Sequence, residues 1–230
     1  MTTHWPTVMQ AGAEGPQRAA ALDQVCRVYW YPVYAFIRRQ GKSPEDAQDC
    51  TQAFFEKLLR RGWLDGIEKL ANARFSTWLL TRVKTHLQNA HRDASTEKRG
   101  GSAQPLSIDL LQAENWYGAE PFSDESPERA FERRWALTVL DAALVRLRLD
   151  CAAIGKTELF EDLSPFLSRE PERGEYQVLA AKLQVRENSV AVAVHRLRLQ
   201  YRDAVRAELA AGLADPAMVE EELRHLAACL

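Results

Sequence analysis

Residues 175–206 carry the side chains with the clearest chemistry in this sequence, because they combine a periodic apolar face with a cationic one. Ala180 is small where a first helix must let a second cross it closely, and Leu183 and Val185 flank the expected turn as core anchors. From Val190, an apolar row advances by three or four residues and therefore occupies one helix face. The opposite face suits the major groove of DNA and carries Asn188, Ala191, Val192, His195, Arg196, Leu199 and Arg202.

This pattern predicts a helix-turn-helix whose second helix reads DNA. An ordinary amphipathic hairpin with a solvated arginine face would have the same charges, and that alternative stays open. Gln184 stands in the turn, where glycine is common. A non-glycine residue in a left-handed turn costs about 1 kcal/mol, which a folded domain tolerates.

A second basic segment precedes the first by about ninety residues. Residues 82–99 carry Arg82, Lys84, Arg92, Lys98 and Arg99 against Asp93 and Glu97. Acidic residues concentrate instead at 45–49, 120–128 and 220–222. Two separate basic helices and an acidic helix predict two DNA contacts and a positively charged protein partner.

Cysteine and histidine spacing argues against a metal site. Cys26, Cys50, Cys151 and Cys229 lack the CxxC spacing of zinc fingers, and we expect buried free thiols. The histidines show no ligand spacing on one helix face, and we expect neither metal nor cofactor. No GxSxG, Walker-type, HExxH or paired-histidine motif is present, so we do not expect an enzyme.

The overall composition is that of a globular protein, with 46% hydrophobic and 27% charged residues among 230. The net charge of −2 argues against nonspecific coating of nucleic acid. No apolar run approaches the roughly 20 residues of a membrane span, and the N-terminus does not resemble a secretory signal. We therefore expect a cytoplasmic protein without membrane insertion.

Helical periodicity runs through the chain and strand signals are nearly absent, which predicts an all-α fold. Ser43-Pro44 and Ser126-Pro127 are strong helix start signals, each followed by acidic residues. We expect two small helical domains joined by a flexible linker, with the following boundaries: a first domain over 1–99, a linker over 100–126, a second domain over 127–211, and an amphipathic extension over 212–230. The predicted helices cover residues 18–40, 43–62, 75–98, 129–150, 157–167, 176–183, 188–211 and 216–230.

Several motifs occur together in the order found in one known family. SPEDAQDCTQAFF (residues 43–55) resembles region 2.2 of RNA polymerase sigma factors of the extracytoplasmic-function (ECF) family, and FSTWLL (75–80) resembles the start of their regions 2.3 and 2.4. ERRWAL (132–137) and VHRLR (194–198) resemble region 4. The resemblance covers about residues 18–206.

The resemblance implies a transcription initiation factor that binds core RNA polymerase, at the coiled coil and flap, and directs it to promoters. It implies a polymerase-binding face on the first acidic helix, made of Asp46, Asp49, Gln52 and Glu56. Gln48 and Ala53 stand where the family commonly has acids, and the two missing charges should weaken docking.

Two groups of DNA-binding residues follow from the same resemblance. For recognition and opening of the −10 element, the candidates are Arg82, Lys84, Thr85, Gln88, Asn89, His91 and Arg92. For the −35 element, they are Arg186, Asn188, Ser189, His195, Arg196 and Arg198. The small apolar residues 191–193 cannot make bidentate bonds to guanine, so we expect weak intrinsic readout of the −35 element.

Control by a Ser/Thr kinase is known for some members of this family, and an anti-sigma factor is the other expected regulator. A phosphate on Thr51 would restore about 1.5 to 2 negative charges to the acidic helix. Its place in the apolar stripe favours a core residue instead, and both interpretations stay open. A stand-alone helix-turn-helix regulator is the alternative function.

Overall fold

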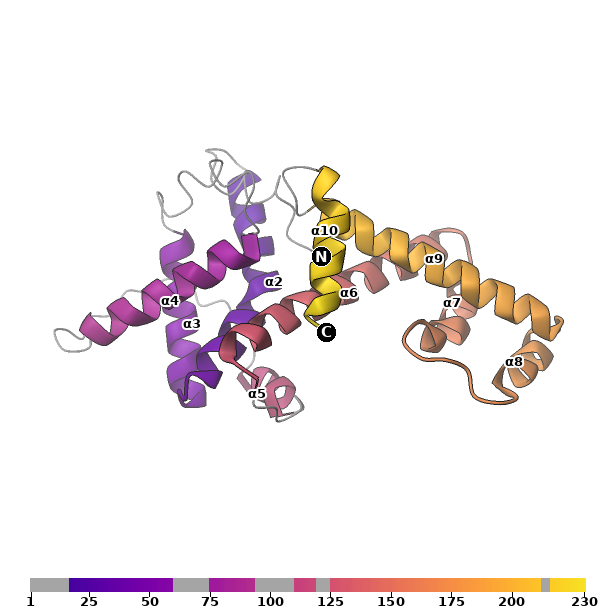
Figure 1. Ribbon diagram of the computed structural model, residues 1–230, viewed down its shortest axis with the longest axis horizontal. Coiled ribbons are helices and arrows are strands. Elements are labelled where there is room, and N and C mark those ends of the chain that lie inside the picture. Colours follow the sequence, from indigo (N-terminus) through magenta and orange to yellow (C-terminus); the bar gives the residue numbers. More distant parts are fainter. Residues whose placement is uncertain (1–16, 60–74, 94–109, 119–124, 212–215) are drawn as a thin grey trace. The chain divides into compact units, whose positions relative to one another are not determined.

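The computed structural model describes residues 17–59, 75–93, 110–118, 125–211 and 216–230, and every regular element within these ranges is helical (Figure 1). This confirms the all-α class. None of the described helices combines the length and apolar character needed to cross a bilayer. The elements are α2 (Gln17–Arg39), α3 (Pro44–Leu59), α4 (Phe75–Asp93), α5 (Leu110–Gly118), α6 (Pro127–Ala153), α7 (Thr157–Leu163), the 3-10 helix η2 (Ser164–Leu167), α8 (Glu175–Leu183), α9 (Glu187–Ala211), the 3-10 helix η3 (Pro216–Met218) and α10 (Val219–Ala228).

The chain divides into two compact units. Unit 1 comprises Met1–Thr138 and Leu209–Leu230, and unit 2 comprises Val139–Glu208, so that α6 and α9 each cross the boundary. This division differs from the predicted one, which separates a first domain over 1–99 from a second over 127–211. The start of α6 and the C-terminal segment belong with the first unit because their apolar side chains are buried there.

The start signal of α3 acts as the sequence predicts, and a glycine ends α2 just before it. Gly41 has φ +84°, a left-handed conformation that ends α2. The Ser43 hydroxyl accepts a hydrogen bond from the Asp46 N–H at 3.1 Å, and the Ser43 carbonyl accepts one from the Ala47 N–H at 2.9 Å. Ser43 therefore caps α3, with Pro44 at the first helical position.

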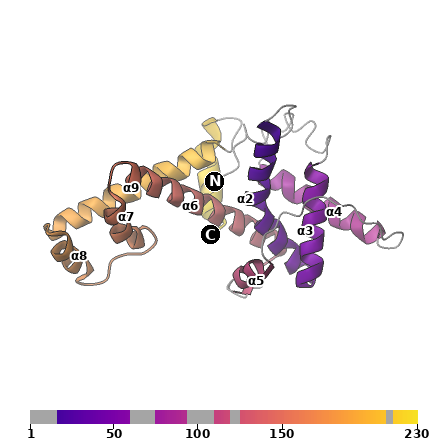
Figure 2. The ribbon, with the colours of Figure 1, turned by 180° about the vertical axis from the view of Figure 1, so that it is seen from behind.

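Aromatic side chains of α2 form the centre of unit 1. Trp30 stacks on Tyr34 with ring centroids 5.1 Å apart, and Phe36 contacts Phe131 of α6 edge to face at 6.5 Å. Phe54 of α3 is fully buried in the same unit. Helices α2 and α3 lie side by side in both views (Figures 1 and 2). This core fixes which face of α4 remains exposed.

A helix lies where the sequence analysis predicts a flexible linker. In α5, the Glu114 carboxylate accepts bonds from Arg38 Nε at 2.8 Å and Arg38 Nη2 at 3.1 Å, and another from the Tyr34 hydroxyl. Trp116 lies edge to face against Tyr31 at 5.1 Å. Nine residues are too few for a stable isolated helix, so the contacts with α2 stabilise α5. No periodic apolar pattern in the sequence predicts this helix.

The predicted C-terminal extension also packs on unit 1. Leu226 and Cys229 of α10 are buried, and the His225 ring lies 5.7 Å from the Trp135 ring of α6. The extension is therefore part of a folded unit through its contacts with α6.

Unit 2 contains the predicted helix-turn-helix, formed by α8 and α9. Ala180, Val190, Val194 and Leu197 are buried in one apolar cluster with residues of α6, α7 and η2, and Leu183 packs partly against it. Val185 was predicted to be a core anchor as well, but it is 46% exposed. It follows Gln184, whose φ of +55° turns the chain so that the next side chain faces solvent.

Within unit 2, α6 buries one face and exposes another. Val145 and Leu149 are 54% and 64% exposed. Leu147 and Cys151 occupy the buried face instead. This face is buried because α7, α8 and α9 pack against it.

Candidate nucleic-acid interface

The helix α4 presents two chemically different faces. Leu79, Val83 and His86 are buried, whereas the opposite face exposes the predicted DNA-binding residues Arg82, Thr85, Gln88 and Asn89. The Thr85 hydroxyl donates to the Thr81 carbonyl at 3.0 Å, and the Arg82 guanidinium lies 5.4 Å from the centre of the Trp78 ring. Amide groups and cations are thus held on one exposed surface. His91 and Arg92 belong to α4, but their side chains lie outside the described residues.

His86 does not contribute charge to this surface. Its ring is 4% exposed and contacts Phe54 at 5.7 Å. Burial, with a smaller effect of the Lys57 charge, lowers the pKa of His86 to about 4. The imidazole is therefore neutral near pH 7 and acts as part of the core.

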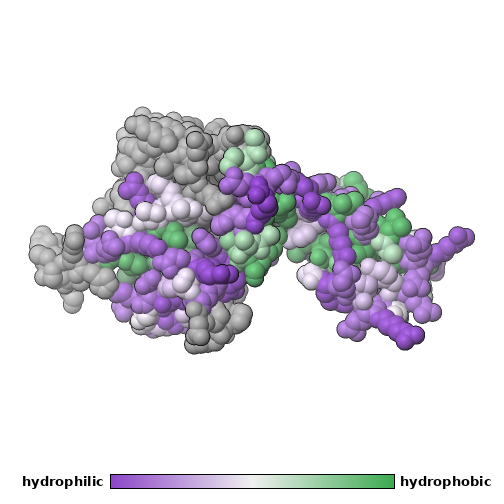
Figure 3. Space-filling view, in the orientation of Figure 1, coloured by the Kyte–Doolittle hydropathy of each residue, from purple (hydrophilic) through white to green (hydrophobic). Residues whose placement is uncertain are grey.

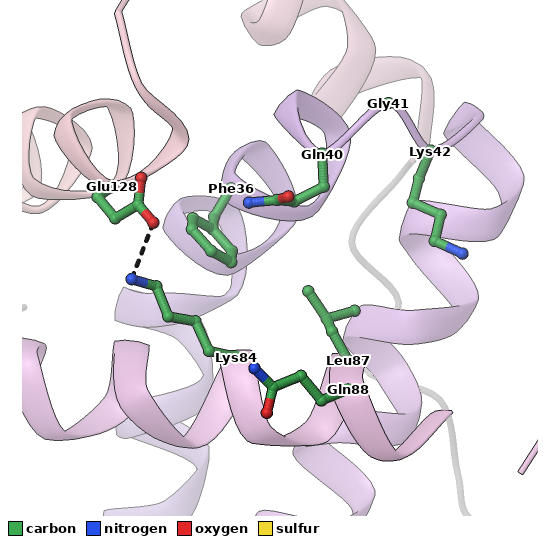
Figure 4. Close-up of a pocket in the computed structure, with 8 residues that line it drawn as sticks. All are labelled: Phe36, Gln40, Gly41, Lys42, Lys84, Leu87, Gln88 and Glu128. Carbon is green, nitrogen blue, oxygen red and sulfur yellow. Dashed lines mark ion pairs between the residues drawn. The ribbon is translucent and has the colours of Figure 1, made fainter. Parts of the chain in front are cut away.

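A pocket of about 540 Å³ lies where α4 faces the ends of α2 and α6 in unit 1 (Figure 4). Lys84, a predicted DNA-binding residue, forms an ion pair there with Glu128: Nζ lies 2.8 Å from Oε1. The pair is partly exposed, and the bond from Lys84 lowers the pKa of Glu128 below its usual range. The pocket is lined by Phe36, Gln40, Gly41, Lys42, Lys84, Leu87, Gln88 and Glu128.

Two of the polar lining residues, Lys84 and Gln88, are predicted from the sequence as DNA-binding residues, whereas Gln40, Lys42 and Glu128 are not. Gln40 and Lys42 lie in the turn between α2 and α3, where no periodic pattern assigns a face. Glu128 is recognised in the sequence as a residue of a helix start. Its ion pair with Lys84 depends on α4 lying opposite the start of α6. Only the packing of three helices brings these groups to one pocket.

The exposed face of α9 holds most of the predicted −35 residues. Asn188, Ser189, His195 and Arg196 are exposed, and Arg186 is exposed in the turn before the helix. The opposite side of α9 is buried in the apolar cluster. Hydrophilic colours predominate over α8 and the adjoining end of α9 in Figure 3. The polar side of a docked second helix is thus available to a partner.

Arg198, which is predicted to contact DNA, is held by groups of its own unit. Its Nε donates to the Phe166 carbonyl and its Nη2 to the Arg169 carbonyl, both at 3.0 Å. Its Nη1 lies 3.0 Å from a Glu170 carboxylate oxygen. The guanidinium binds carbonyls that follow α7, so we assign Arg198 a structural role between α9 and that segment.

The acidic helix α3 exposes Asp46 and Asp49, and Gln52 and Glu56 are half-buried. Positions spaced in this way share one side of a helix, away from the buried Phe54. This side is a negatively charged surface with room for a cationic partner. The structure therefore brings the four predicted polymerase-binding residues together.

Thr51 is fully buried in this structure, and its hydroxyl donates to the Ala47 carbonyl at 2.7 Å. This geometry supports the interpretation of Thr51 as a core residue. A kinase needs the hydroxyl in solution, so phosphorylation would require α3 to leave its packing.

Comparisons with protein-family models, with curated proteins and with solved structures found no significant match to this chain.

Proposed function

We propose that this protein is a transcription initiation factor of the ECF sigma type, which binds core RNA polymerase and directs it to promoters. The observation that carries the proposal is the helix-turn-helix of unit 2. Its second helix buries Val190 and Val194 and exposes Asn188 and Arg196. An apolar back with a polar, cationic front is the arrangement that a major-groove reading helix needs.

The α4 surface supports a second DNA contact, with the −10 element. Arg82, Gln88 and Asn89 offer a cation and two amides, groups that bind phosphates and the edges of unstacked bases. The cation–π contact of Arg82 with Trp78 places an aromatic ring on the same helix. Stacking on such groups offsets part of the few kcal/mol that unstacking a base costs.

The α3 surface supports docking on a cationic protein. Asp46 and Asp49 are exposed at the start of a helix whose other side is locked into the core of unit 1. Rigid presentation of charge favours association, because little conformational entropy is lost on binding. The proposed partner is the coiled coil of the polymerase's largest subunit, with unit 2 at the flap.

Control by a regulator is part of the proposal. Because the Thr51 hydroxyl is buried, a kinase would act only on a partly opened α3. An anti-sigma factor could cover the exposed acidic side of α3 without any such opening. Mass spectrometry of protein from activating conditions distinguishes control by a kinase from control by an anti-sigma factor, since only the kinase leaves a phosphate on the chain.

The test of the function is run-off transcription with purified core polymerase. We expect promoter-specific transcripts with the wild-type chain and a large loss with Asp46→Lys/Asp49→Lys, whose charge is reversed on an exposed surface. Glu158→Lys is the matched control, because Glu158 is an exposed acid in the first turn of α7. The proposal is contradicted if the wild-type chain does not associate with core polymerase. A stand-alone DNA-binding regulator would then remain, since it also uses a helix-turn-helix.

A further inference from the structure

The C-terminal helix α10 places a histidine and a cysteine beside a glutamate of α6. His225 and Cys229 are one turn apart, so their side chains share a face of the helix. The Cys229 Sγ lies 3.6 Å from Nε2 and 3.9 Å from Nδ1 of His225. One ligand atom from each of Glu132, His225 and Cys229 lies within 4.8 Å of the other two. Three groups able to bind a metal thus converge from two helices.

The distance from the sulfur to one ring nitrogen equals the separation of two ligands around a tetrahedral metal ion. Zinc binds sulfur at about 2.3 Å and imidazole nitrogen at about 2.0–2.1 Å, so two such ligands at a tetrahedral angle lie roughly 3.6 Å apart. The separation of Cys229 Sγ and His225 Nε2 is 3.6 Å. Sγ also lies 3.9 Å from Nδ1, whereas a sulfur that shares an ion with Nε2 lies about 5 Å from Nδ1, so the His225 ring must turn before both atoms bind one ion.

The surroundings favour a bound ion over a chance encounter of side chains. Cys229 is 7% exposed, and Glu132 and His225 are half-buried. The Trp135 ring lies 5.7 Å from the His225 ring on one side. Ligands that are already ordered lose little entropy when a metal binds.

We propose that Glu132, His225 and Cys229 bind one divalent transition-metal ion of the zinc class, with water in the fourth position. A thiolate and an imidazole select such ions over Mg²⁺ and Ca²⁺, which prefer oxygen ligands. Binding requires the Cys229 thiol to lose its proton to solvent. The ion would fasten α10 to α6, and because the unfolded chain lacks the site, binding would raise stability.

This inference does not depend on the proposed function and is tested on the full chain alone. Metal-free protein is titrated with Co²⁺, which reports a thiolate ligand by a sulfur-to-cobalt charge-transfer absorption. We expect one equivalent to produce that absorption and Zn²⁺ to abolish it. Cys229→Ser should remove the absorption, and Glu132→Gln or His225→Gln should weaken affinity by at least the roughly 10–100-fold that loss of an outer partner costs. Cys50→Ser is the control, because Cys50 is a half-buried thiol on α3.

Thermal unfolding gives a second readout that does not involve the spectrum. Zn²⁺ should raise the melting temperature of the wild type and of Cys50→Ser, and at the same Zn²⁺ concentration it should raise that of His225→Gln by less, because the affinity is weaker. Circular dichroism establishes that each variant is folded. The proposal is overturned if the wild type gives no charge-transfer absorption, if Cys229→Ser gives the same absorption, or if Zn²⁺ stabilises His225→Gln as much as the wild type.

Discussion

The Lys84 ammonium group lies 2.8 Å from a carboxylate oxygen of Glu128, across the pocket that α4 shares with α2 and α6 (Figure 4). Lys84 is one of the cations proposed to contact promoter DNA, and Glu128 is an acid of the same unit. The carboxylate therefore competes with phosphate for this ammonium group. Binding of DNA at this end of α4 must break the pair or leave Lys84 out of the contact.

Glu128→Gln should strengthen binding of −10 single-stranded DNA by about 1.4- to 5-fold, because exposed ion pairs are worth roughly 0.2–1 kcal/mol. Fluorescence anisotropy over a series of salt concentrations measures the effect. Lys84→Ala should weaken binding and reduce the salt dependence, since one phosphate contact is lost. In the Lys84→Ala background Glu128→Gln should change little, and an equal gain in both backgrounds would show that the pair does not restrain Lys84.

Arg196 and Arg198 of α9 form a matched pair for testing the helix-turn-helix. Arg196→Ala should reduce affinity for −35 duplex DNA by about 1–3 kcal/mol and leave the melting temperature unchanged, because Arg196 is exposed. Arg198→Ala should lower stability by about 1–3 kcal/mol, because it leaves the Phe166 and Arg169 carbonyls without this donor. Electrophoretic mobility shifts and urea unfolding measure the two effects. The assignment of the two roles fails if Arg196→Ala is the variant that unfolds more easily.

Substitutions of Thr51 separate a core residue from a modification site. Thr51→Val keeps the shape and loses the bond to the Ala47 carbonyl, so it should cost about 1 kcal/mol. Thr51→Glu places a charge at a fully buried position and should destabilise the protein by about 3 kcal/mol or more. Urea unfolding measures both. Wild-type stability together with increased transcription for Thr51→Glu would instead support phosphorylation at an opened α3.

The burial of His86 predicts a pH dependence of stability. Its pKa is lowered to about 4 in the folded chain, against about 6.5 for an unperturbed histidine. Between these values the unfolded chain binds a proton that the folded chain does not. The free energy of unfolding therefore falls as the pH drops from 6.5 to 4, by roughly 3 kcal/mol at most, and this contribution levels off below pH 4.

His86→Leu should remove that contribution, so the stability of the variant should fall less steeply than that of the wild type over this interval. Urea unfolding at a series of pH values measures the slopes. His195→Gln is the control, because His195 is exposed on α9. Equal slopes for the wild type and His86→Leu would show that folding does not lower the pKa of His86.

Local signals in the sequence predicted the helix boundaries well where the physical cause is local. Ser43 and Gly41 act within one turn of their own positions, and the apolar row of α9 follows from the helical period. Helix-end residues and apolar rows can both be recognised without knowing which other helices pack against the segment. The class of the fold and the exposed cationic face of α9 therefore follow from the sequence.

Contacts between distant residues decided the rest. The helix α5 exists through the bond of Arg38 to Glu114, 76 residues away along the chain, and α10 belongs to unit 1 through packing on α6. The spacing of His225 and Cys229 is visible in the sequence, but two possible ligands alone are weak evidence for a metal site. The third possible ligand, Glu132, is brought beside them only by the packing of α10 on α6. Local periodicity sets which face of a helix is apolar. Only tertiary packing sets which side chains from other helices meet that face, because those contacts depend on chain paths that no short segment encodes.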